Sequence, residues 1–237
     1  MIRMGALPFA SPAEESARKR ASMLASSAPI AVEFDRRIVA RFDAAGVARA
    51  RRALSFARSL TAATADHPSI DVYMSHPLRI ALSCLDLAPD AGPGAVETAL
   101  LHNAFEIGGV DEGALAAAGF RPDLGAEIRL LTIERARETD RAYLARFYDA
   151  IARHGAMLSL VRCVDKLDNL LGAAAIADPA VHASYVGLAE EFVGPMATRL
   201  DSAFGAYFAA VVAQARAHGP DPAFAARAAA YANGAAA

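Results

Sequence analysis

The sequence predicts an all-α fold built as a single helical domain, and three observations support this. Alanine, a strong helix former, contributes much of the 55% of residues that are hydrophobic. Apolar side chains recur three and four residues apart over most of the chain. No run of alternating β-branched residues between turn dipeptides indicates a strand. Because no shift in composition divides the chain, residues 1–237 are expected to form one domain.

The first helices are predicted from a cap and from hydrophobic spacing. Ser11 is followed three residues later by Glu14, the spacing of a capping box, so a helix is expected to begin at the proline after Ser11. Apolar residues opposite arginines then predict two further helices. They cover residues 28–46 and 47–64, with Gly46 as the expected point of separation.

Proline and glycine set the expected ends of the later helices. A helix is expected over Pro77–Leu87, because proline fits a first helical turn, and His76 then lies at its start. A central helix is expected over Ala95–Ile107, ended by a left-handed cap at Gly108 and Gly109. Further helices are expected over residues 112–118, 123–132, 138–155 and 155–175, and up to the alanine-rich tail, which is expected to fray.

Composition excludes several classes of function. A formal charge of -2 and a pI near 6.3 provide no basic surface for nucleic acid. The apolar run Ser202–Ala215 is shorter than the roughly 20 residues that cross a bilayer. No apolar segment near the N-terminus indicates a secretory signal, so a cytoplasmic protein without nucleic-acid or membrane partners is expected. Cys84 and Cys163 lie in apolar helices and are expected to be buried free thiols.

Polar side chains interrupt the apolar pattern of the central helix, in ETALLHNAFEIGG. His102 and Glu106 are four residues apart and share a helix face, and Asn103 lies beside them. An imidazole, an amide and a carboxylate on an apolar helix indicate either a hydrogen-bonded polar group in the core or a functional site.

A second interruption lies in LSLVRCVDKLDNLLG, where Asp165 and Asn169 are four residues apart on one helix face. A buried carboxylate is costly without a cation or strong donors, so Asp165 needs such partners. Arg162 and Lys166 flank it, and they either bind phosphate oxygens or are ordinary solvated side chains. The arginines of the earlier segment IERARETDR either reach the mouth of a site or form surface ion pairs; they are Arg135, Arg137 and Arg141.

Histidines are the candidate partners of this carboxylate. Two imidazoles, an amide and a carboxylate on different predicted helices can converge on one divalent ion in the folded bundle. These residues are His76, His102, Asn103 and Asp165. The other histidines are explained by a turn before proline, by a surface position, and by two helix ends before glycine. In that order they are His67, His182, His154 and His218.

The order of these residues resembles that of the HD superfamily of metal-dependent phosphohydrolases, whose signature is a His, a His-Asp pair and a distant Asp on an all-helical fold. More narrowly, the chain is similar to the hydrolase domain of the RelA/SpoT alarmone enzymes and their small single-domain relatives. The likeness covers roughly residues 50–200. It rests on YMSHPLRIA for the first His, ALLHNAFE for the pair, DKLDN for the last Asp, and FVGPMATRL for a later segment.

The resemblance implies a chemistry and a role for individual residues. A divalent metal, usually Mn²⁺, would activate water for hydrolysis of a phosphorylated nucleotide, with alarmones of the guanosine 3′-pyrophosphate type as candidates. The implied metal ligands are His76, His102, Asn103 and Asp165. The expected catalytic residues are Glu106 and Asn103, and the expected substrate contacts are Tyr73, Arg162, Lys166 and Asn169.

Three departures from the family pattern bear on this interpretation. Asn103 stands where the family has Asp, which removes a negative charge and predicts weaker Mn²⁺ binding. Ile107 stands where alarmone hydrolases have a second acid. The segment TADHPSIDVY lacks the Arg and Lys that those enzymes carry before the first His, which argues against guanosine tetraphosphate as the substrate.

The sequence thus predicts a metal-dependent phosphohydrolase with a small phosphorylated nucleotide as its substrate. One alternative is a degenerate family member that binds a nucleotide or a protein partner without turnover, which the Asn103 and Ile107 departures favour. Another is different metal chemistry, such as oxidation at iron. The alanine-rich C-terminal helices either complete the core or provide a face for homo-oligomer formation.

Overall fold

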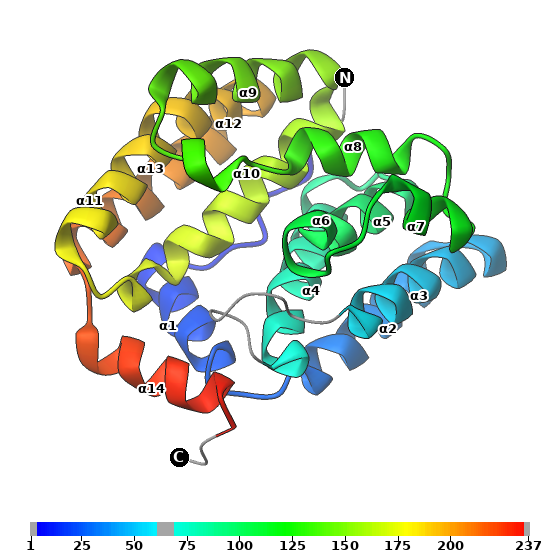
Figure 1. Ribbon diagram of the computed structural model, residues 1–237, viewed down its shortest axis with the longest axis horizontal. Coiled ribbons are helices and arrows are strands. Elements are labelled where there is room, and N and C mark those ends of the chain that lie inside the picture. Colours follow the sequence, from blue (N-terminus) through cyan, green and yellow to red (C-terminus); the bar gives the residue numbers. More distant parts are fainter. Residues whose placement is uncertain (1–3, 61–68, 235–237) are drawn as a thin grey trace.

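The computed structural model describes residues 4–60 and 69–234, and this part of the chain consists of helices and their connections, without a strand (Figure 1). The predicted all-α fold is confirmed. The α-helices are α1 (Pro12–Ser22), α2 (Ala28–Arg41), α3 (Ala44–Ser59), α4 (Ile70–Leu87), α5 (Pro93–Leu101), α6 (Ala104–Ile107), α7 (Glu112–Ala117), α8 (Leu124–Leu131), α9 (Arg141–His154), α10 (Ala156–Leu171), α11 (Pro179–Leu188), α12 (Gly194–Leu200), α13 (Ser202–His218) and α14 (Pro222–Ala232). Short 3-10 or π segments are η1 (Arg135–Arg137), η2 (Ala173–Ala175) and η3 (Ala189–Val193).

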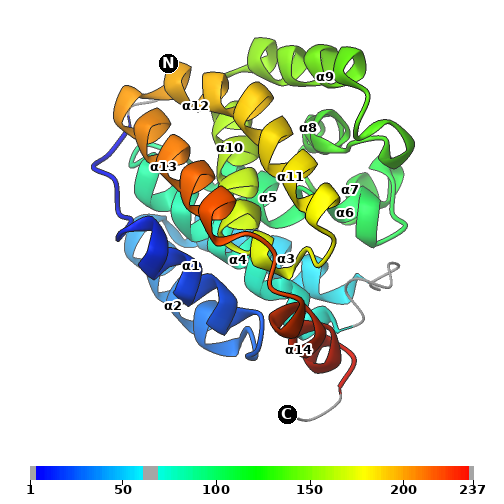
Figure 2. The same ribbon diagram turned by 90° about the vertical axis from the view of Figure 1, so that its left-hand side faces the viewer.

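Helix α10 runs through the middle of the molecule. It has α11, α12 and α13 on one side and α4 and α5 on the other (Figure 1 and Figure 2). Leu160, Val161 and Cys163 on this helix are fully buried, which a helix covered on several faces requires. Charged residues of α10 are consequently placed inside the protein.

The N-terminal helix begins where the sequence predicted. The Ser11 hydroxyl accepts a hydrogen bond from the Glu14 backbone N–H at 3.4 Å, and the Glu14 carboxylate accepts one from the Ser11 N–H at 3.0 Å. This reciprocal pair is the predicted capping box. Helix α1 packs against α10 and α13, so its inner face reaches the centre of the molecule.

The separation of the next two helices lies before Gly46, not at it. The Asp43 side chain accepts a hydrogen bond from the Gly46 backbone N–H at 2.8 Å and thereby caps α3. Aspartate is a strong N-cap residue, and a glycine in the first helical turn does not end a helix. The predicted break at Gly46 is therefore wrong, and α3 ends at Ser59 rather than at residue 64.

Helix α4 begins at Ile70, and the predicted start at Pro77 is wrong. Pro77 lies inside the helix, where it removes one backbone hydrogen bond. The turns before it bury Tyr73 and Met74, and this packing outweighs the lost bond. His76 therefore lies in the interior of α4 rather than at a helix start.

The predicted central helix is broken in the middle. Helix α5 ends at Leu101, and α6 begins at Ala104. Asn103 between them has φ -105° and ψ 11°, close to the sparsely populated bridge region in which many site residues lie. Its carbonyl oxygen accepts from the N–H groups of Glu106 and Ile107, each at 3.0 Å.

Most other local predictions on described residues are confirmed. Gly109 has φ +60°, as a left-handed helix end requires. Cys84 and Cys163 are buried free thiols, and burial raises the pKa of Cys84 to about 12. No helix within residues 4–60 or 69–234 is long and apolar enough to cross a membrane.

The predictions for the four histidines outside the candidate site have different outcomes. His154 and His218 end α9 and α13 as expected. His182 was expected at the surface but is buried, because α11 packs against α13 and η2. His67 and the predicted frayed tail at residues 235–237 lie outside the described residues.

Candidate metal centre

Two histidines and an aspartate meet between α4, α5 and α10. Asp165 Oδ1 on α10 lies 3.3 Å from Nε2 of His76 on α4 and 3.6 Å from Nε2 of His102, the residue that follows α5. One ligand atom from each residue lies within 4.8 Å of the others. The structure thus brings together His76, His102 and Asp165, which the sequence predicted to converge.

The His102 ring is oriented by the backbone. Its Nδ1 lies 2.8 Å from the Ala99 carbonyl oxygen, which can only accept a hydrogen bond. Nδ1 therefore carries the hydrogen, and Nε2 is left with its lone pair. That Nε2 is buried and has no hydrogen-bond partner among the residues that the structure describes. Nε2 of His102 is thus available to a metal ion.

The His76 ring is oriented by a second aspartate. Its Nδ1 lies 2.8 Å from Oδ2 of Asp168, and an ionised carboxylate can only accept. The lone pair of His76 Nε2 consequently faces Asp165 Oδ1. When both rings are neutral, their two lone pairs therefore face the Asp165 oxygen that also accepts from Asn169, and a cation is the group that can bind all three atoms.

The electrostatics of the cluster favour positive charge. Burial alone would raise the pKa of Asp165, but His102, His76 and the Arg162 guanidinium hold it well below its usual range. Burial likewise opposes the charged form of His76, yet Asp165 and Asp168 raise the pKa of His76. A proton or a metal cation would be stabilised beside Asp165 for the same reason.

The two flanking cations of α10 differ in their surroundings. Arg162 is buried, donates from Nη1 to Asp165 Oδ2 at 2.8 Å, and lies 5.1 Å over the Phe147 ring. It is not a solvated side chain. Lys166 extends the other way, with Nζ 3.4 Å from the Tyr185 hydroxyl and 4.8 Å above its ring.

Asparagine side chains lie on both sides of the cluster. Asn169 donates from Nδ2 to Asp165 Oδ1 at 2.8 Å, as the four-residue spacing predicted. Asn103 hydrogen-bonds the buried Tyr73 hydroxyl, and burial raises the pKa of Tyr73. The side chain of Asn103 is therefore engaged with Tyr73.

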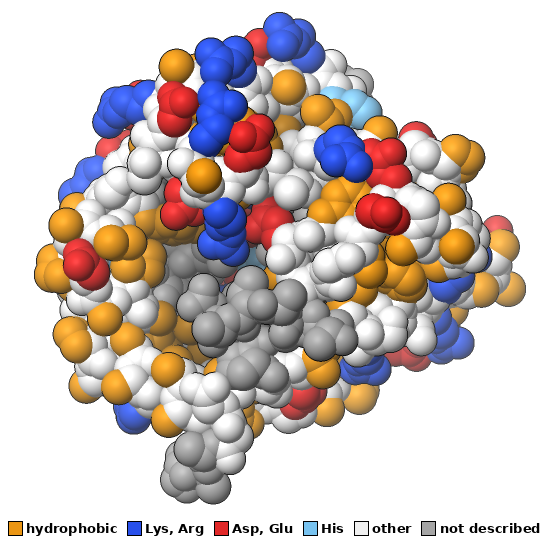
Figure 3. All heavy atoms as spheres, viewed as in Figure 1, with side chains coloured by type: hydrophobic (Ala, Val, Ile, Leu, Met, Phe, Trp, Pro, Cys, Tyr) orange, Lys and Arg blue, Asp and Glu red, His pale blue; other side chains and the backbone are white. Residues whose placement is uncertain are grey.

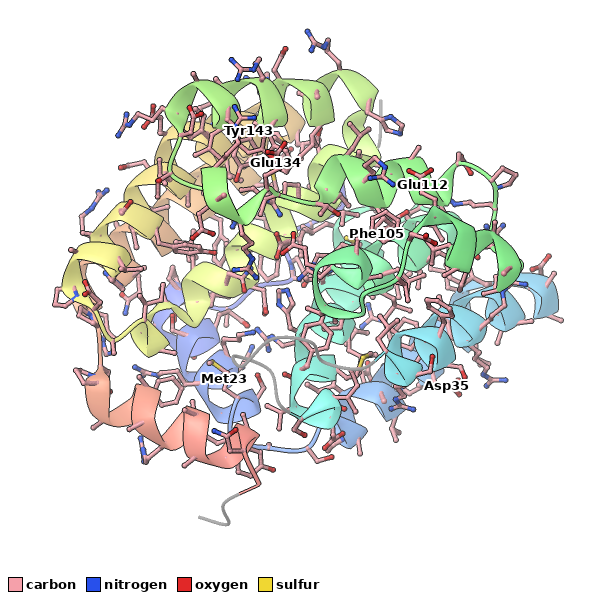
Figure 4. The ribbon with its side chains drawn as sticks, in the orientation of Figure 1. Met23, Asp35, Phe105, Glu112, Glu134 and Tyr143 are labelled. Atoms are coloured by element: carbon pink, nitrogen blue, oxygen red, sulfur yellow. The ribbon has the colours of Figure 1, made fainter. Side chains whose placement is uncertain are left out.

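Glu106 lies close enough to Tyr73 and Arg162 to interact with both electrostatically. Acidic and basic side chains gather on the upper part of the face seen in Figure 3. Oε1 of Glu106 accepts from the Ile133 backbone N–H at 3.2 Å, and its Oε2 is 3.5 Å from Nη2 of Arg135. Arg135 belongs to η1, which is anchored where Glu134 and Tyr143 lie together (Figure 4), because the Glu134 N–H donates to the Tyr143 hydroxyl at 3.0 Å.

The other two arginines of this segment form ion pairs. Arg137 lies 3.3 Å from Asp140, and Arg141 lies 2.6 Å from Glu191. Both are surface pairs, the second of the two alternatives that the sequence left open. Of the three arginines, Arg135 is the one that contacts a candidate site residue.

Sequence reasoning missed Asp168 and the cations that hold it. Lys19 on α1 and Arg79 on α4 both donate to this carboxylate. Burial alone would raise the pKa of Asp168, but these two cations and His76 hold it well below its usual range. The available signal was the position of Asp168 on an apolar helix, three residues after Asp165.

Comparisons with known proteins add no assignment. No protein-family model matches the chain, and no curated protein matches its sequence. The candidate function therefore depends on the side chains of the site and on their order along the chain.

Proposed function

We propose that the chain is a metal-dependent phosphohydrolase in which His76, His102 and Asp165 bind one divalent cation, with Mn²⁺ as the candidate ion. The observation that carries the proposal is the convergence of three acceptor atoms within 4.8 Å. Buried acceptors that face one another are costly unless a cation lies among them. Two imidazoles and a carboxylate suit divalent first-row metals.

The proposed reaction is hydrolysis of a phosphoanhydride or phosphoester bond in a phosphorylated nucleotide. A bound divalent ion would lower the pKa of water and polarise a phosphoryl oxygen. Glu106 would accept the proton as the water oxygen bonds to phosphorus and the bond to the leaving group breaks. This role is supported by the electrostatic interaction of Glu106 with Tyr73 and with Arg162, the arginine that pairs with Asp165.

Substrate contacts are proposed for the polar groups that surround Asp165. Lys166 is the better candidate for a phosphate oxygen, because Arg162 already pairs with Asp165. Asn169 presents an amide beside the same carboxylate. Tyr73 is hydrogen-bonded to Asn103, the residue that follows His102. The order of these residues along the chain supports the proposed place in the HD superfamily.

One observation favours a second candidate function, nucleotide binding without turnover. Asn103 brings no charge to the site, and Arg162 neutralises the one carboxylate among the ligand candidates. A hard ion such as Mn²⁺ is then held more weakly than by two carboxylates. Zn²⁺ and Fe²⁺ depend less on carboxylate charge, since imidazole is a good ligand for both.

Metal analysis and a phosphate-release screen test the proposal. The chain would be loaded with Mn²⁺, Zn²⁺ or Fe²⁺ in separate samples and incubated with nucleoside diphosphates, triphosphates and 3′-pyrophosphates. Metal-dependent phosphate release that is lost in His102→Ala and Glu106→Gln is the expected result. Glu112→Gln, which removes an exposed carboxylate paired with Arg129, is the control and should keep full activity.

The other outcomes separate the candidates. Metal binding without release from any nucleotide would favour the binding protein. Failure of the unchanged chain to bind any of the three ions would overturn the metal centre. Full turnover by Glu106→Gln would remove the proton-accepting role from Glu106 and leave the metal centre standing.

A further inference from the structure

Asp168 is a buried carboxylate that the proposed reaction does not use. It lies on α10 one turn after Asp165 and is 4% exposed. Its Oδ1 accepts from Nε of Arg79 at 2.6 Å. Its Oδ2 accepts from Nζ of Lys19 and lies 2.8 Å from Nδ1 of His76. The carboxylate therefore joins α1, α4 and α10 at one point.

The contact with His76 is not needed to neutralise Asp168. Lys19 and Arg79 already place two positive charges on this carboxylate. The contact with His76 instead determines the state of the ring. Because the carboxylate accepts at Nδ1, the lone pair of Nε2 is directed to Asp165 Oδ1, 3.3 Å away. A flipped ring would lose both contacts.

The two histidines of the metal centre are thus held in different ways. His102 is held by the Ala99 carbonyl within its own helical segment, so its orientation follows from the backbone. His76 is held by a side chain whose own position depends on α1 and α4. A carboxylate behind a ligating histidine fixes its tautomer and makes its other nitrogen more basic.

We infer that Asp168 is a positioning residue of the metal centre, which holds the His76 ring for metal binding while Lys19 and Arg79 hold Asp168 in place. The inference rests on the proposed metal centre. It makes α1 part of the site, because Lys19 is the contribution of that helix to the cluster.

Metal titrations of Asp168→Asn test this role. The variant keeps the shape of the side chain but loses its charge, and it should bind Mn²⁺ about 10–100-fold more weakly than the unchanged chain. The visible absorption bands of bound Co²⁺ should also shift, because the His76 ring is no longer fixed. A purely structural role would leave the spectrum of the bound ion unchanged.

The matched control is Glu97→Gln. Glu97 is also a buried carboxylate held by guanidinium groups, and it pairs with Arg49, Arg52 and Arg121 rather than with the ligand candidates. This variant should lose stability and keep both the Mn²⁺ affinity and the Co²⁺ spectrum. Equal loss of affinity in Glu97→Gln and Asp168→Asn would overturn the inference, because the effect would then follow from destabilisation alone.

A second variant decides the question if Asp168→Asn does not fold. Lys19→Gln removes a cation from Asp168 without touching His76, His102 or Asp165. Weaker Mn²⁺ binding by this variant supports the inference, and unchanged affinity overturns it. Absence of metal binding by the unchanged chain would overturn the proposed function itself. Unchanged binding and spectrum in Asp168→Asn would overturn only the role of Asp168.

Discussion

Glu97 and His102 lie five residues apart on one helical segment, and each is the centre of a buried polar cluster. Around Glu97, carboxylate oxygens meet guanidinium donors. Arg49 donates to them from Nε at 3.0 Å and from Nη2 at 2.6 Å, and Nε of Arg121 lies 3.4 Å away. Around His102, a ring nitrogen with a lone pair faces a carboxylate oxygen of Asp165 at 3.6 Å.

The two clusters differ in the matching of donors to acceptors rather than in burial or charge. Glu97 is 0% exposed and His102 is 1% exposed, so desolvation is severe in both. Arginines surround Glu97 and satisfy it. Within residues 4–60 and 69–234, Nε2 of His102 has no hydrogen-bond partner, and a bound cation would supply one. A buried polar cluster therefore indicates a binding site where ring lone pairs face a carboxylate oxygen and no donor lies between them.

The largest effect is expected from breaking the cluster of Glu97 and its arginines. Glu97→Gln removes the buried counter-charge of Arg49 and Arg121 and should lower the free energy of unfolding by about 3 kcal/mol. The loss lies at the low end for a broken buried pair, because the Arg49 side chain is 38% exposed and can turn toward water. Urea unfolding without metal measures it. A loss below about 1 kcal/mol would contradict the comparison, since exposed pairs contribute that much.

The second largest effect is expected from binding of Mn²⁺ to the cluster around His102. Free Mn²⁺ at 100 times its Kd should raise the free energy of unfolding by about 2.7 kcal/mol, because the ion binds the folded chain and not the unfolded one. Thermal or urea unfolding with and without Mn²⁺ measures the gain, and a chelator should reverse it. His102→Ala is the control and should gain nothing. Equal gains in both proteins would place the ion elsewhere.

Much of the fold follows from local signals in the sequence. The Ser11 and Glu14 capping box formed as predicted, because both partners lie within one helical turn. The start of α4 was mispredicted, because the cost of Pro77 inside a helix is local while the packing of Tyr73 that outweighs it is tertiary. His182 was placed at the surface for the same reason, since the packing of α11 is invisible in its own sequence.

The candidate site shows the same difference between residues with a local signal and residues whose role depends on tertiary contacts. His102 and Asp165 stood out because they interrupt apolar helices, and His76 was predicted to join them as a candidate partner of Asp165. The structure brings the three residues together. Asp168 did not stand out, because a carboxylate near Lys166 on a helix resembles half of a solvated ion pair. Its actual cation from α1, Lys19, is 149 residues away in the chain.

A smaller effect is expected from adding a charged acceptor to the cluster around His102. Asn103→Asp introduces a carboxylate at the residue after His102 and should tighten Mn²⁺ binding about tenfold, or about 1.4 kcal/mol, because a hard ion prefers charged oxygen ligands. Calorimetric titration measures the affinity. Asn233→Asp adds the same charge at the end of α14 and should change nothing. Unchanged affinity in Asn103→Asp would mean that this side chain does not contact the metal.

The smallest effect is expected at the rim of the metal centre, where charge is present but burial is not. Arg135 lies 3.5 Å from Glu106, and its side chain is 61% exposed. Arg135→Ala should therefore change the free energy of unfolding by less than about 0.5 kcal/mol, because water replaces an exposed ion pair at little cost. Mn²⁺ affinity should also stay unchanged, since Arg135 contacts Glu106 and not the ligand candidates.

Parallel urea unfolding and Mn²⁺ titration of Arg135→Ala and the neighbouring Arg137→Ala measure both quantities. A loss above about 1 kcal/mol confined to Arg135→Ala would show that its pair with Glu106 behaves like the buried Glu97 cluster, and exposure would then fail to separate the rim from the interior.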